Sequence, residues 1–310
     1  MLTVFQSALG QMIILFLFMT LGYLLRKKGF LGPDTGKSLS KLELWVFCPC
    51  LNILTYARNC TVEVFVEDLP LILLSVVLLL VVAIPVSRLI SAKLGRDEAE
   101  RAVYRYSLCF SNSGYIGYPI VKAVFGEEVL MDTMIFCIPI SIAIYTYGLY
   151  VLIPRENFTW KKLFNPSTLT PFIGMLIGFS GIALPNVLIN AMEMGSDCMA
   201  PIAMLLTGFV LANQPLKTMV LNWRAYVASV IRLIAIPLFV AVTMFALNIR
   251  GELLLISATI LAMPMGLNSV VFPEAFGGDA TSGSQSNFIS NLMGIVTIPF
   301  MLALFQMLAF

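Results

Sequence analysis

About ten apolar segments, each near the length of a membrane span, follow one another along this 310-residue chain. A helix of about 20 apolar residues crosses the hydrocarbon core of a bilayer. Charged residues make up only 12% of the chain, against about 25% in an average soluble domain. The sequence therefore predicts an all-α membrane protein. The predicted spans are 3–25, 38–57, 68–91, 101–124, 129–153, 167–185, 190–212, 222–247, 252–275 and 284–309.

The Lys and Arg residues predict how these spans are oriented, because cytoplasmic loops carry an excess of both. The loops after spans 1, 3, 5 and 7 hold fifteen of them, whereas the alternate loops hold Arg58, Lys122 and Arg250. This asymmetry predicts both termini outside, in a multi-pass protein of the plasma (inner) membrane. The first ten residues lack a basic region, so the first apolar segment is expected to be a span and not a signal peptide.

The fourth and ninth spans contain residues that a lipid-facing helix should lack. Gly, Pro, Asn and Ser interrupt span 4 in "SNSGYIGYPI" (111–120) and span 9 in "MPMGLNS" (263–269). An unpaired backbone group costs several kcal/mol in lipid, so an irregular backbone is stable only inside the protein or along a wet cavity. We therefore expect each break to lie where two interrupted helices meet.

A weak internal repeat relates the two breaks. The Phe-Gly pair at 125–126 recurs at 276–277, and the same offset of 151 lays 109–119 on 260–270. Each half holds five spans, an odd number, so the second half would enter the membrane from the opposite side. The sequence thus predicts ten transmembrane helices as a 5+5 inverted repeat with broken, crossing helices 4 and 9, an architecture common in secondary transporters. The predicted parts are 1–153 (first repeat), 154–166 (cytoplasmic linker) and 167–310 (second repeat).

The residues around the breaks indicate what such a crossing would bind. The N-terminal ends of half-helices carry partial positive charge and free N–H groups, which bind carboxylates without a basic side chain. No charged side chain occurs from 106 to 121 or from 253 to 273. Carriers of cations usually place carboxylates inside the membrane. The pattern therefore favours an organic anion over sodium or protons as the main substrate.

The candidate substrate site combines the small and polar residues of both breaks with polar residues of neighbouring spans. Pro119 is expected to begin the second half of span 4, since proline needs no N–H there. The alternative is that these residues only let helices pack closely, and for Asn52 contact and packing are equally open. The predicted substrate-binding residues are Asn112, Ser113, Gly114, Tyr115, Gly117, Pro119, Asn52, Met263, Pro264, Gly266, Asn268, Ser269 and Asn291.

Charged residues inside the spans are few. Arg232, within span 8, is either an anion attractor that faces the transport path or a structural, snorkelling residue. Glu43, near the cytoplasmic end of span 2, is expected to be a capping or interfacial residue. The chain has no histidine, and its six cysteines form no CxxC pair. No catalytic residue, metal site or cofactor is therefore predicted, and the chain is not expected to be an enzyme.

Several segments resemble one known family. "SNSGYIGYP" resembles the Asn-x-Gly-x-x-Gly-x-Pro signature in the fourth helix of the auxin efflux carrier family, with Asn112, Gly114, Gly117 and Pro119 in the matching positions. "KLELWVFCPCLNIL" is similar to its second helix. "AMPMGLNSVVFPEAFGGD" and "SNFISNLMGIVTIPF" are similar to its ninth and tenth helices. The linker between the halves is short, as in compact prokaryotic members.

The resemblance implies a secondary transporter of a small organic anion, a carboxylate such as a dicarboxylate or an auxin-like acid. The implied fold is like that of bile-acid symporters and sodium/proton antiporters. Helices 1, 2, 6 and 7 would form a scaffold, and helices 3–5 and 8–10 a transport domain that moves as an elevator. Proton or sodium coupling and a homodimer stay open, and nucleic acid is not an expected partner. The alternative function is an anion channel or facilitator with the same crossover site.

Overall fold

The computed structural model describes residues 2–157, 159, 164–213, 215, 217 and 220–310. These residues fold into helices, and no β-strand occurs among them. The bridge between Ser111 and Met265 is the one place in this part of the chain where extended segments pair. The prediction of an all-α protein is therefore confirmed.

The helices of the first half begin and end within three residues of the five ranges predicted there, and a short helix, α4, adds to the loop before the third. The elements are α1 (Leu2–Lys27), α2 (Thr35–Leu42), η1 (Glu43–Phe47), α3 (Cys48–Asn59), α4 (Val62–Glu67), α5 (Leu69–Val77), η2 (Leu78–Ala83), α6 (Ile84–Leu94), α7 (Glu98–Cys109), η3 (Ser113–Gly117), α8 (Tyr118–Phe125), α9 (Glu127–Phe136), α10 (Ile138–Ala143), η4 (Ile144–Gly148) and α11 (Leu149–Leu152).

Helices of the second half begin and end within five residues of the five ranges predicted for it, apart from η5, which lies in the predicted linker. The elements are η5 (Arg155–Asn157), α13 (Pro166–Ser180), α14 (Asn186–Asp197), α15 (Met199–Leu211), α17 (Trp223–Val230), η6 (Ile231–Ala235), α18 (Ile236–Ala246), α19 (Glu252–Leu261), α20 (Asn268–Phe276) and α21 (Ala280–Ala309).

Some of these helical stretches are long and apolar enough to cross a bilayer unaided. In the described residues four stretches meet that standard: Leu69–Leu94, Asn186–Leu211, Trp223–Ala246 and Ala280–Ala309. The pair Glu127–Phe136 and Ile138–Leu152, bent by 45°, makes a fifth if it is counted as one span. These stretches support an integral membrane protein, and the number of ten spans stays a prediction.

Proline shapes several of these helices. Four of the five π-helical turns in the described residues are followed directly by a helix with proline at its first or second position. Proline has no N–H, so the carbonyl one turn earlier loses its α-helical donor and the helix widens locally. The tripeptide Ala-Ile-Pro follows this pattern at 83–85 and again at 235–237, 152 residues later. That spacing is within one residue of the repeat seen in the sequence.

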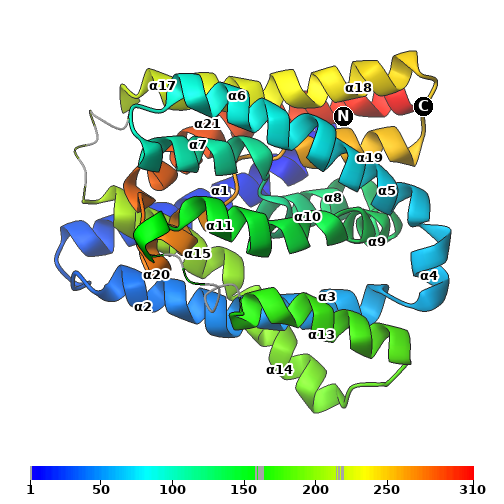
Figure 1. Ribbon diagram of the computed structural model, residues 1–310, viewed down its shortest axis with the longest axis horizontal. Coiled ribbons are helices and arrows are strands. Elements are labelled where there is room, and N and C mark those ends of the chain that lie inside the picture. Colours follow the sequence, from blue (N-terminus) through cyan, green and yellow to red (C-terminus); the bar gives the residue numbers. More distant parts are fainter. Residues whose placement is uncertain (1, 158, 160–163, 214, 216, 218–219) are drawn as a thin grey trace.

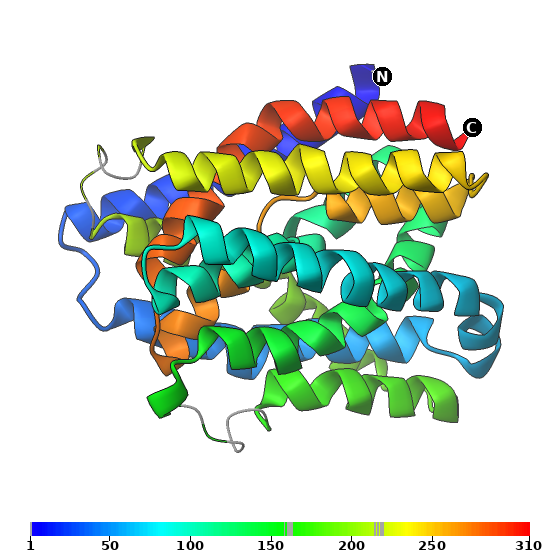
Figure 2. The same ribbon diagram turned by 45° about the horizontal axis from the view of Figure 1, so that its top comes forward.

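The helices run roughly along the long axis of the molecule (Figure 1). Both termini lie at one end, together with the 181–185 connection, whereas the connections 28–34 and 95–97 lie at the opposite end (Figures 1 and 2). The connections 28–34 and 95–97 belong to two of the Lys- and Arg-rich loops that are predicted to be cytoplasmic. The distribution of the connections thus agrees with a membrane crossed end to end.

The helices pack in two groups. One group consists of α1, α2–α3, α13 and α14–α15, in which α1 lies along α15 and α13 lies along α3. The other consists of α5–α11 and α17–α21, in which α6 packs on α7, α18 on α19, and α20 on α21. Contacts of α1 and α15 with α21 join the groups. We name each group after one pair of helices that pack together in it: the α1–α15 group after α1 and α15, and the α7–α21 group after α7 and α21.

Glycine permits the close crossing of α1 and α15, because a Cβ on Gly208 would overlap the backbone of Met19. We expect Gly208→Ala to lower the free energy of unfolding by about 1–3 kcal/mol, the usual effect of forcing extra atoms into a packed core. Thermal unfolding in detergent measures it. The control is Gly10→Ala on the same pair of helices, since nothing lies within 4 Å of a Cβ there. Equal stability of both variants would contradict the close crossing.

Candidate functional site

The first helix break lies between α7 and η3. Phe110 has an extended backbone, with φ −114° and ψ 126°. Asn112 is the N-cap of the next helical stretch, and its Oδ1 accepts a hydrogen bond from the Tyr115 N–H at 3.3 Å. The second half-helix therefore begins at Ser113. The expectation that Pro119 begins it is wrong: Pro119 follows a π-helical turn inside the half-helix, because the side chain of Asn112 already caps its first turn.

The second break, between α19 and α20, crosses the first as an antiparallel pair. The Asn112 N–H donates to the Pro264 carbonyl at 2.8 Å, and the Gly266 N–H donates to the Phe110 carbonyl at 3.1 Å. Each extended segment thus supplies the partners that the other lacks. Backbone groups freed by two breaks are satisfied inside the protein, as a membrane interior requires.

Helix α21 holds the second extended segment in place. The Met265 N–H donates to Ser290 Oγ at 2.9 Å, and Asn287 Nδ2 donates to the Met265 carbonyl at 2.8 Å. Asn291 Nδ2 in turn donates to Asn287 Oδ1 at 2.6 Å. Asn291, predicted to bind substrate, therefore lies behind the crossing and orients Asn287.

The neighbours of Gly266 leave little space for a side chain at this position. A Cβ there would come within 3.2 Å of a ring carbon of Tyr106 and 3.3 Å of the Phe110 carbonyl oxygen. Both distances are tighter than ordinary van der Waals contact, and one neighbour is backbone of the other extended segment. A larger residue would push the two segments apart.

Both half-helix N-terminal ends line one small cavity of about 50 Å³ at the crossing. It is formed by polar and aromatic side chains from η3, η4, α3, α7, α15 and the start of α20. Of the predicted site residues, those that line it are Asn52, Asn112, Ser113, Gly114, Tyr115, Gly266 and Asn268. Nδ2 of Asn112 is buried and has no hydrogen-bond partner among the described residues. A donor at the cavity is thus left unpaired by the protein.

The other predicted residues lie around the cavity. Met263 is fully buried behind the crossing, and a Cβ on Gly117 would be 3.4 Å from it. Ser269 Oγ donates to the Gly266 carbonyl at 2.8 Å. Pro264 contributes its carbonyl to the crossing, and Pro119 lines an adjoining hollow.

Eleven residues outside the predicted site also line the cavity, and four of them are tyrosines. Each lies in a predicted span among apolar residues, where a packing role is the simplest interpretation. The signal that was available is the set of tyrosine hydroxyls within spans, since such groups need partners when buried. The additional lining residues are Leu51, Thr55, Tyr56, Tyr106, Ser111, Tyr118, Ser141, Ile144, Tyr145, Met199 and Leu267.

Arg232 lies against the C-terminal ends of α7 and α19, the half-helices that precede the two breaks. Its Nη1 donates to the Leu108 carbonyl at 3.1 Å, and the residue is 1% exposed. Cys109 and Leu261, the last residues of α7 and α19, line a separate cavity of about 20 Å³ with it. A cation near helix C-terminal ends compensates their partial negative charge. Arg232 does not line the crossing cavity, so its position matches the structural interpretation.

A larger hollow of about 700 Å³, here called the vestibule, adjoins the cavity. Five of its residues also line the cavity: Leu51, Gly114, Tyr115, Tyr118 and Met199. Its walls come from both groups of helices, with Ser196 and Asp197 on one side and Pro119 and Lys122 on the other. Helix α8 extends from the crossing toward the end that holds the termini (Figure 1).

Polar contacts also join the two groups on the other side of the cavity. The Tyr115 hydroxyl donates to Glu43 Oε1 at 2.8 Å, and the Tyr145 hydroxyl lies 2.6 Å from Cys48 Sγ. Glu43 is only 1% exposed. The expectation of a capping or interfacial Glu43 is therefore wrong, because the fold carries η3 over that part of span 2.

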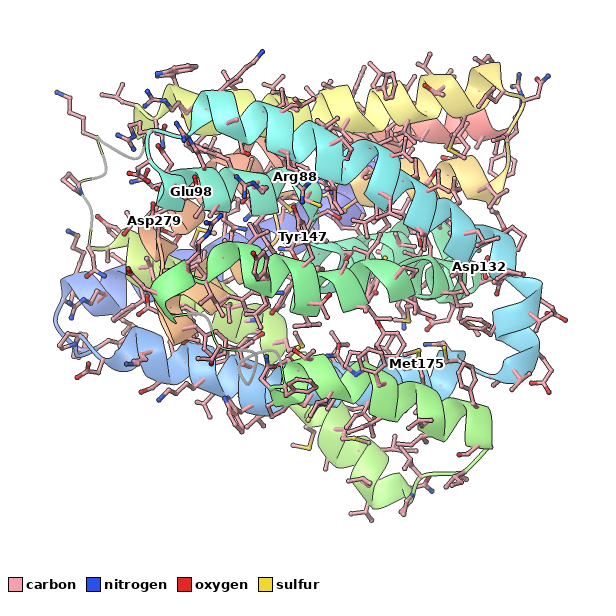
Figure 3. The ribbon with its side chains drawn as sticks, viewed as in Figure 1. Arg88, Glu98, Asp132, Tyr147, Met175 and Asp279 are labelled. Carbon is pink, nitrogen blue, oxygen red and sulfur yellow. The ribbon has the colours of Figure 1, made fainter. Side chains whose placement is uncertain are left out.

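Within the α7–α21 group, a contact between Arg88 and Tyr147 joins α6 to η4. Figure 3 shows Arg88 and Tyr147 pointing toward each other from these two helices. Arg88 Nε donates to the Tyr147 hydroxyl at 3.4 Å, and its guanidinium carbon lies 5.8 Å from the ring centre. This contact helps to keep the group together as a unit.

Crossed, interrupted helices around a buried polar cavity, in a chain with membrane-spanning helices, define the class of membrane transporters. The chain belongs to the family described as "Membrane transport protein", whose model matches residues 7–158 and 151–302. It is a compact member of the prokaryotic type, and the resemblance to auxin efflux carriers is confirmed. The family is one of membrane transporters.

The individual relatives described next are also named as transporters or auxin efflux carriers. The chain is 24% identical over 299 residues to the uncharacterized transporter MJ1031 of Methanocaldococcus jannaschii, covering 92% of this chain and 95% of that one. It is 22% identical over 319 residues to the uncharacterized transporter YfdV of Escherichia coli, covering 96% and 97%. It is 30% identical over 122 residues to auxin efflux carrier component 7 of Arabidopsis thaliana, covering 38% of this chain and 20% of the plant protein.

We expect Asn287→Ala to destabilise the crossing, because it leaves the buried Met265 carbonyl and Asn291 amide without their partners. An unpaired buried polar group costs about 1–3 kcal/mol. The measurement is the thermal unfolding midpoint of detergent-solubilised protein. Gln306→Ala on the exposed far part of α21 is the control. An unchanged midpoint for Asn287→Ala would show that α21 does not hold the extended segment.

Proposed function

We propose that this protein is a secondary transporter that moves a small organic anion, of the carboxylate class, by alternating access. The observation that carries the proposal is that the N-terminal ends of both interrupted helices line one cavity, while Arg232 lies at their C-terminal ends. This arrangement exposes two partial positive charges and unpaired N–H groups to the cavity. A carboxylate is the chemical group that complements them.

The lining side chains support an anion of small size. Asn112 Nδ2 supplies a donor without a protein partner, and Asn52 and Asn268 add amide groups. None of the described residues that line the cavity is charged. Helix dipoles and neutral donors hold an anion without the tight pairing that would prevent its release. The cavity volume of about 50 Å³ favours a small anion over one as large as a bile acid.

The proposed architecture is ten spans in a 5+5 inverted repeat, with repeats 1–153 and 167–310 and the linker 154–166 between them. The recurrence of Ala-Ile-Pro after a π-helical turn, at 83–85 and 235–237, supports equivalent third and eighth spans. The two crossing breaks support equivalent fourth and ninth spans. An odd number of spans in each repeat gives the inverted relation.

The proposed movement is that of an elevator. The α1–α15 group corresponds to the scaffold of helices 1, 2, 6 and 7, and the α7–α21 group to the transport domain of helices 3–5 and 8–10. The cavity and the vestibule lie where these groups meet, so sliding one group past the other would carry the cavity across the membrane. The vestibule gives the cavity access from the end that holds the termini, which the positive-inside rule assigns to the outside.

The proposal predicts that Asn112→Ala abolishes transport, because the side chain both caps η3 and offers Nδ2 to the substrate. The measurement is uptake by purified protein in liposomes, for malonate, malate, oxalate, citrate, a bile acid and indole-3-acetate in turn. Asn190→Ala, an exposed asparagine on α14, should transport at the wild-type rate.

The concentration dependence of the same flux separates a carrier from the alternative, an anion channel or facilitator. A carrier saturates with substrate and exchanges labelled for unlabelled anion, whereas a channel conducts in proportion to concentration. Normal transport by folded Asn112→Ala would refute the site. A rapid, non-saturating flux would favour the channel.

The proposed orientation is tested with two exposed apolar loop residues. In a variant with the native cysteines replaced, we expect Ile182→Cys to react with a membrane-impermeant thiol reagent added outside intact cells. Phe30→Cys should react only after the membrane is opened. The two side chains are 65% and 74% exposed, so access to solvent is comparable. The reverse labelling pattern would invert the proposed topology.

A further inference from the structure

Glu43 is a buried carboxyl group that the anion site described above does not use. It lies in η1, eight residues after the start of α2, about 12 Å along a helix. Its Oε1 accepts the hydrogen bond from Tyr115, and its Oε2 is buried without a hydrogen-bond partner among the described residues. One oxygen of the carboxyl group is therefore available to hold a proton.

Within the part of the chain that the structure describes, no basic group compensates a charge at this position. Glu43 takes part in no ion pair within the described residues. The titratable groups that face it are the Tyr115 hydroxyl from η3 and the Cys48 thiol from α3, with Tyr145 of η4 behind Cys48.

The remaining helices packed against η1 add no close cation. Helices α13 and α15 carry no titratable side chain. On α2, Lys37 and Lys41 are exposed. On α14, Asp197 is exposed and Glu193 pairs with Arg58 at 2.6 Å. An isolated carboxylate is costly to bury, so the carboxyl group in this arrangement suits its neutral, protonated form.

Tyr115 connects this carboxyl group to the anion cavity. Its ring lines the cavity, and its hydroxyl reaches Glu43. The same hydrogen bond crosses between the two groups of helices, on the side of the cavity away from the vestibule. A change of charge at Glu43 therefore acts on both the cavity and the contact between the groups.

We propose that Glu43 is the proton-carrying residue that couples anion transport to proton movement, an inference that rests on the proposed function. Its Oε2 takes a proton from water on one side of the membrane and releases it to water on the other. The O–H bond of the carboxylic acid is the one bond that forms and breaks. The transported unit is one anion together with one proton.

The physical reason for coupling is the short distance between the two charges. An anion in the cavity and a carboxylate at Glu43 are separated by one tyrosine side chain in a medium of low dielectric constant, so they repel strongly. Binding of the anion therefore favours the protonated Glu43, and protonation of Glu43 favours binding of the anion. A carrier that moves most readily with both or neither bound transports them together.

The test uses liposomes that contain the full-length protein and a pH-sensitive dye inside. Each anion of the panel named above is supplied outside, with and without an inward proton gradient. We expect the wild type to take up protons with the anion and to be stimulated by the gradient. Glu43→Gln keeps the size of the side chain and an oxygen that accepts from Tyr115. It should lose both the proton uptake and the stimulation.

A second measurement shows whether that variant is still a working protein. In counterflow, vesicles loaded with unlabelled anion take up labelled anion without a proton gradient. Glu43→Gln should retain counterflow, because glutamine resembles the protonated carboxyl group. Glu193→Gln, which removes a partly exposed carboxylate of α14 that pairs with Arg58, is the matched control and should behave as wild type in both assays.

The outcomes separate the two proposals. Anion flux without proton uptake in the wild type, or proton uptake that survives in Glu43→Gln, overturns the role of Glu43 and leaves the proposed function standing. If Glu43→Gln loses counterflow as well, infrared spectroscopy decides: a protonated-carboxyl band that changes with pH in the wild type supports the inference, and its absence overturns it. If the wild type moves none of the six anions, the proposed function fails and the inference falls with it.

Discussion

The backbone at a broken helix must find hydrogen-bond partners inside the protein, and the rest of this structure follows from that requirement. The segments around Ser111 and Met265 pair with each other, which forces the two interrupted helices to cross. Ser290 of α21 accepts from the Met265 N–H, Asn287 of α21 donates to the Met265 carbonyl, and Arg232 donates to the Leu108 carbonyl. These contacts hold helices that are far apart in sequence in one arrangement. At the crossing, the N-terminal ends of η3 and α20 lie on one side, and the C-terminal ends of α7 and α19 lie on the other.

This separation of helix ends gives the crossing its chemistry. The N-terminal ends bring partial positive charge to the cavity, where Asn112 Nδ2 has no hydrogen-bond partner among the described residues. The buried guanidinium of Arg232 lies at the C-terminal ends, which carry partial negative charge. The two tyrosine contacts with η1 and α3 then join the cavity to the other group of helices. Tyr115, one of the residues proposed to hold an anion, therefore also contacts the other group of helices.

Much of the site could be predicted because breaks have a local signature. Gly, Pro, Asn and Ser within an apolar segment marked both breaks, and seven of the thirteen predicted substrate residues line one cavity. Other positions depended on contacts that no local pattern encodes. The start of the second half-helix moved from Pro119 to Ser113, because a capping side chain outweighed the preference of proline for a first turn. Asn291 supports the crossing from behind because α21 packs along it.

The sequence by itself determined the class, the helical content, the positions of the breaks and the family, because each follows from composition and short-range pattern. Only the tertiary structure decided which groups meet. It placed Arg232 at the carbonyl ends of the half-helices, gathered tyrosines from separate spans around one cavity, and buried Glu43 against Tyr115. Such meetings join residues up to 124 positions apart. They depend on how whole helices pack. The free energy of that packing is spread over many side chains, so no single segment of the sequence predicts it.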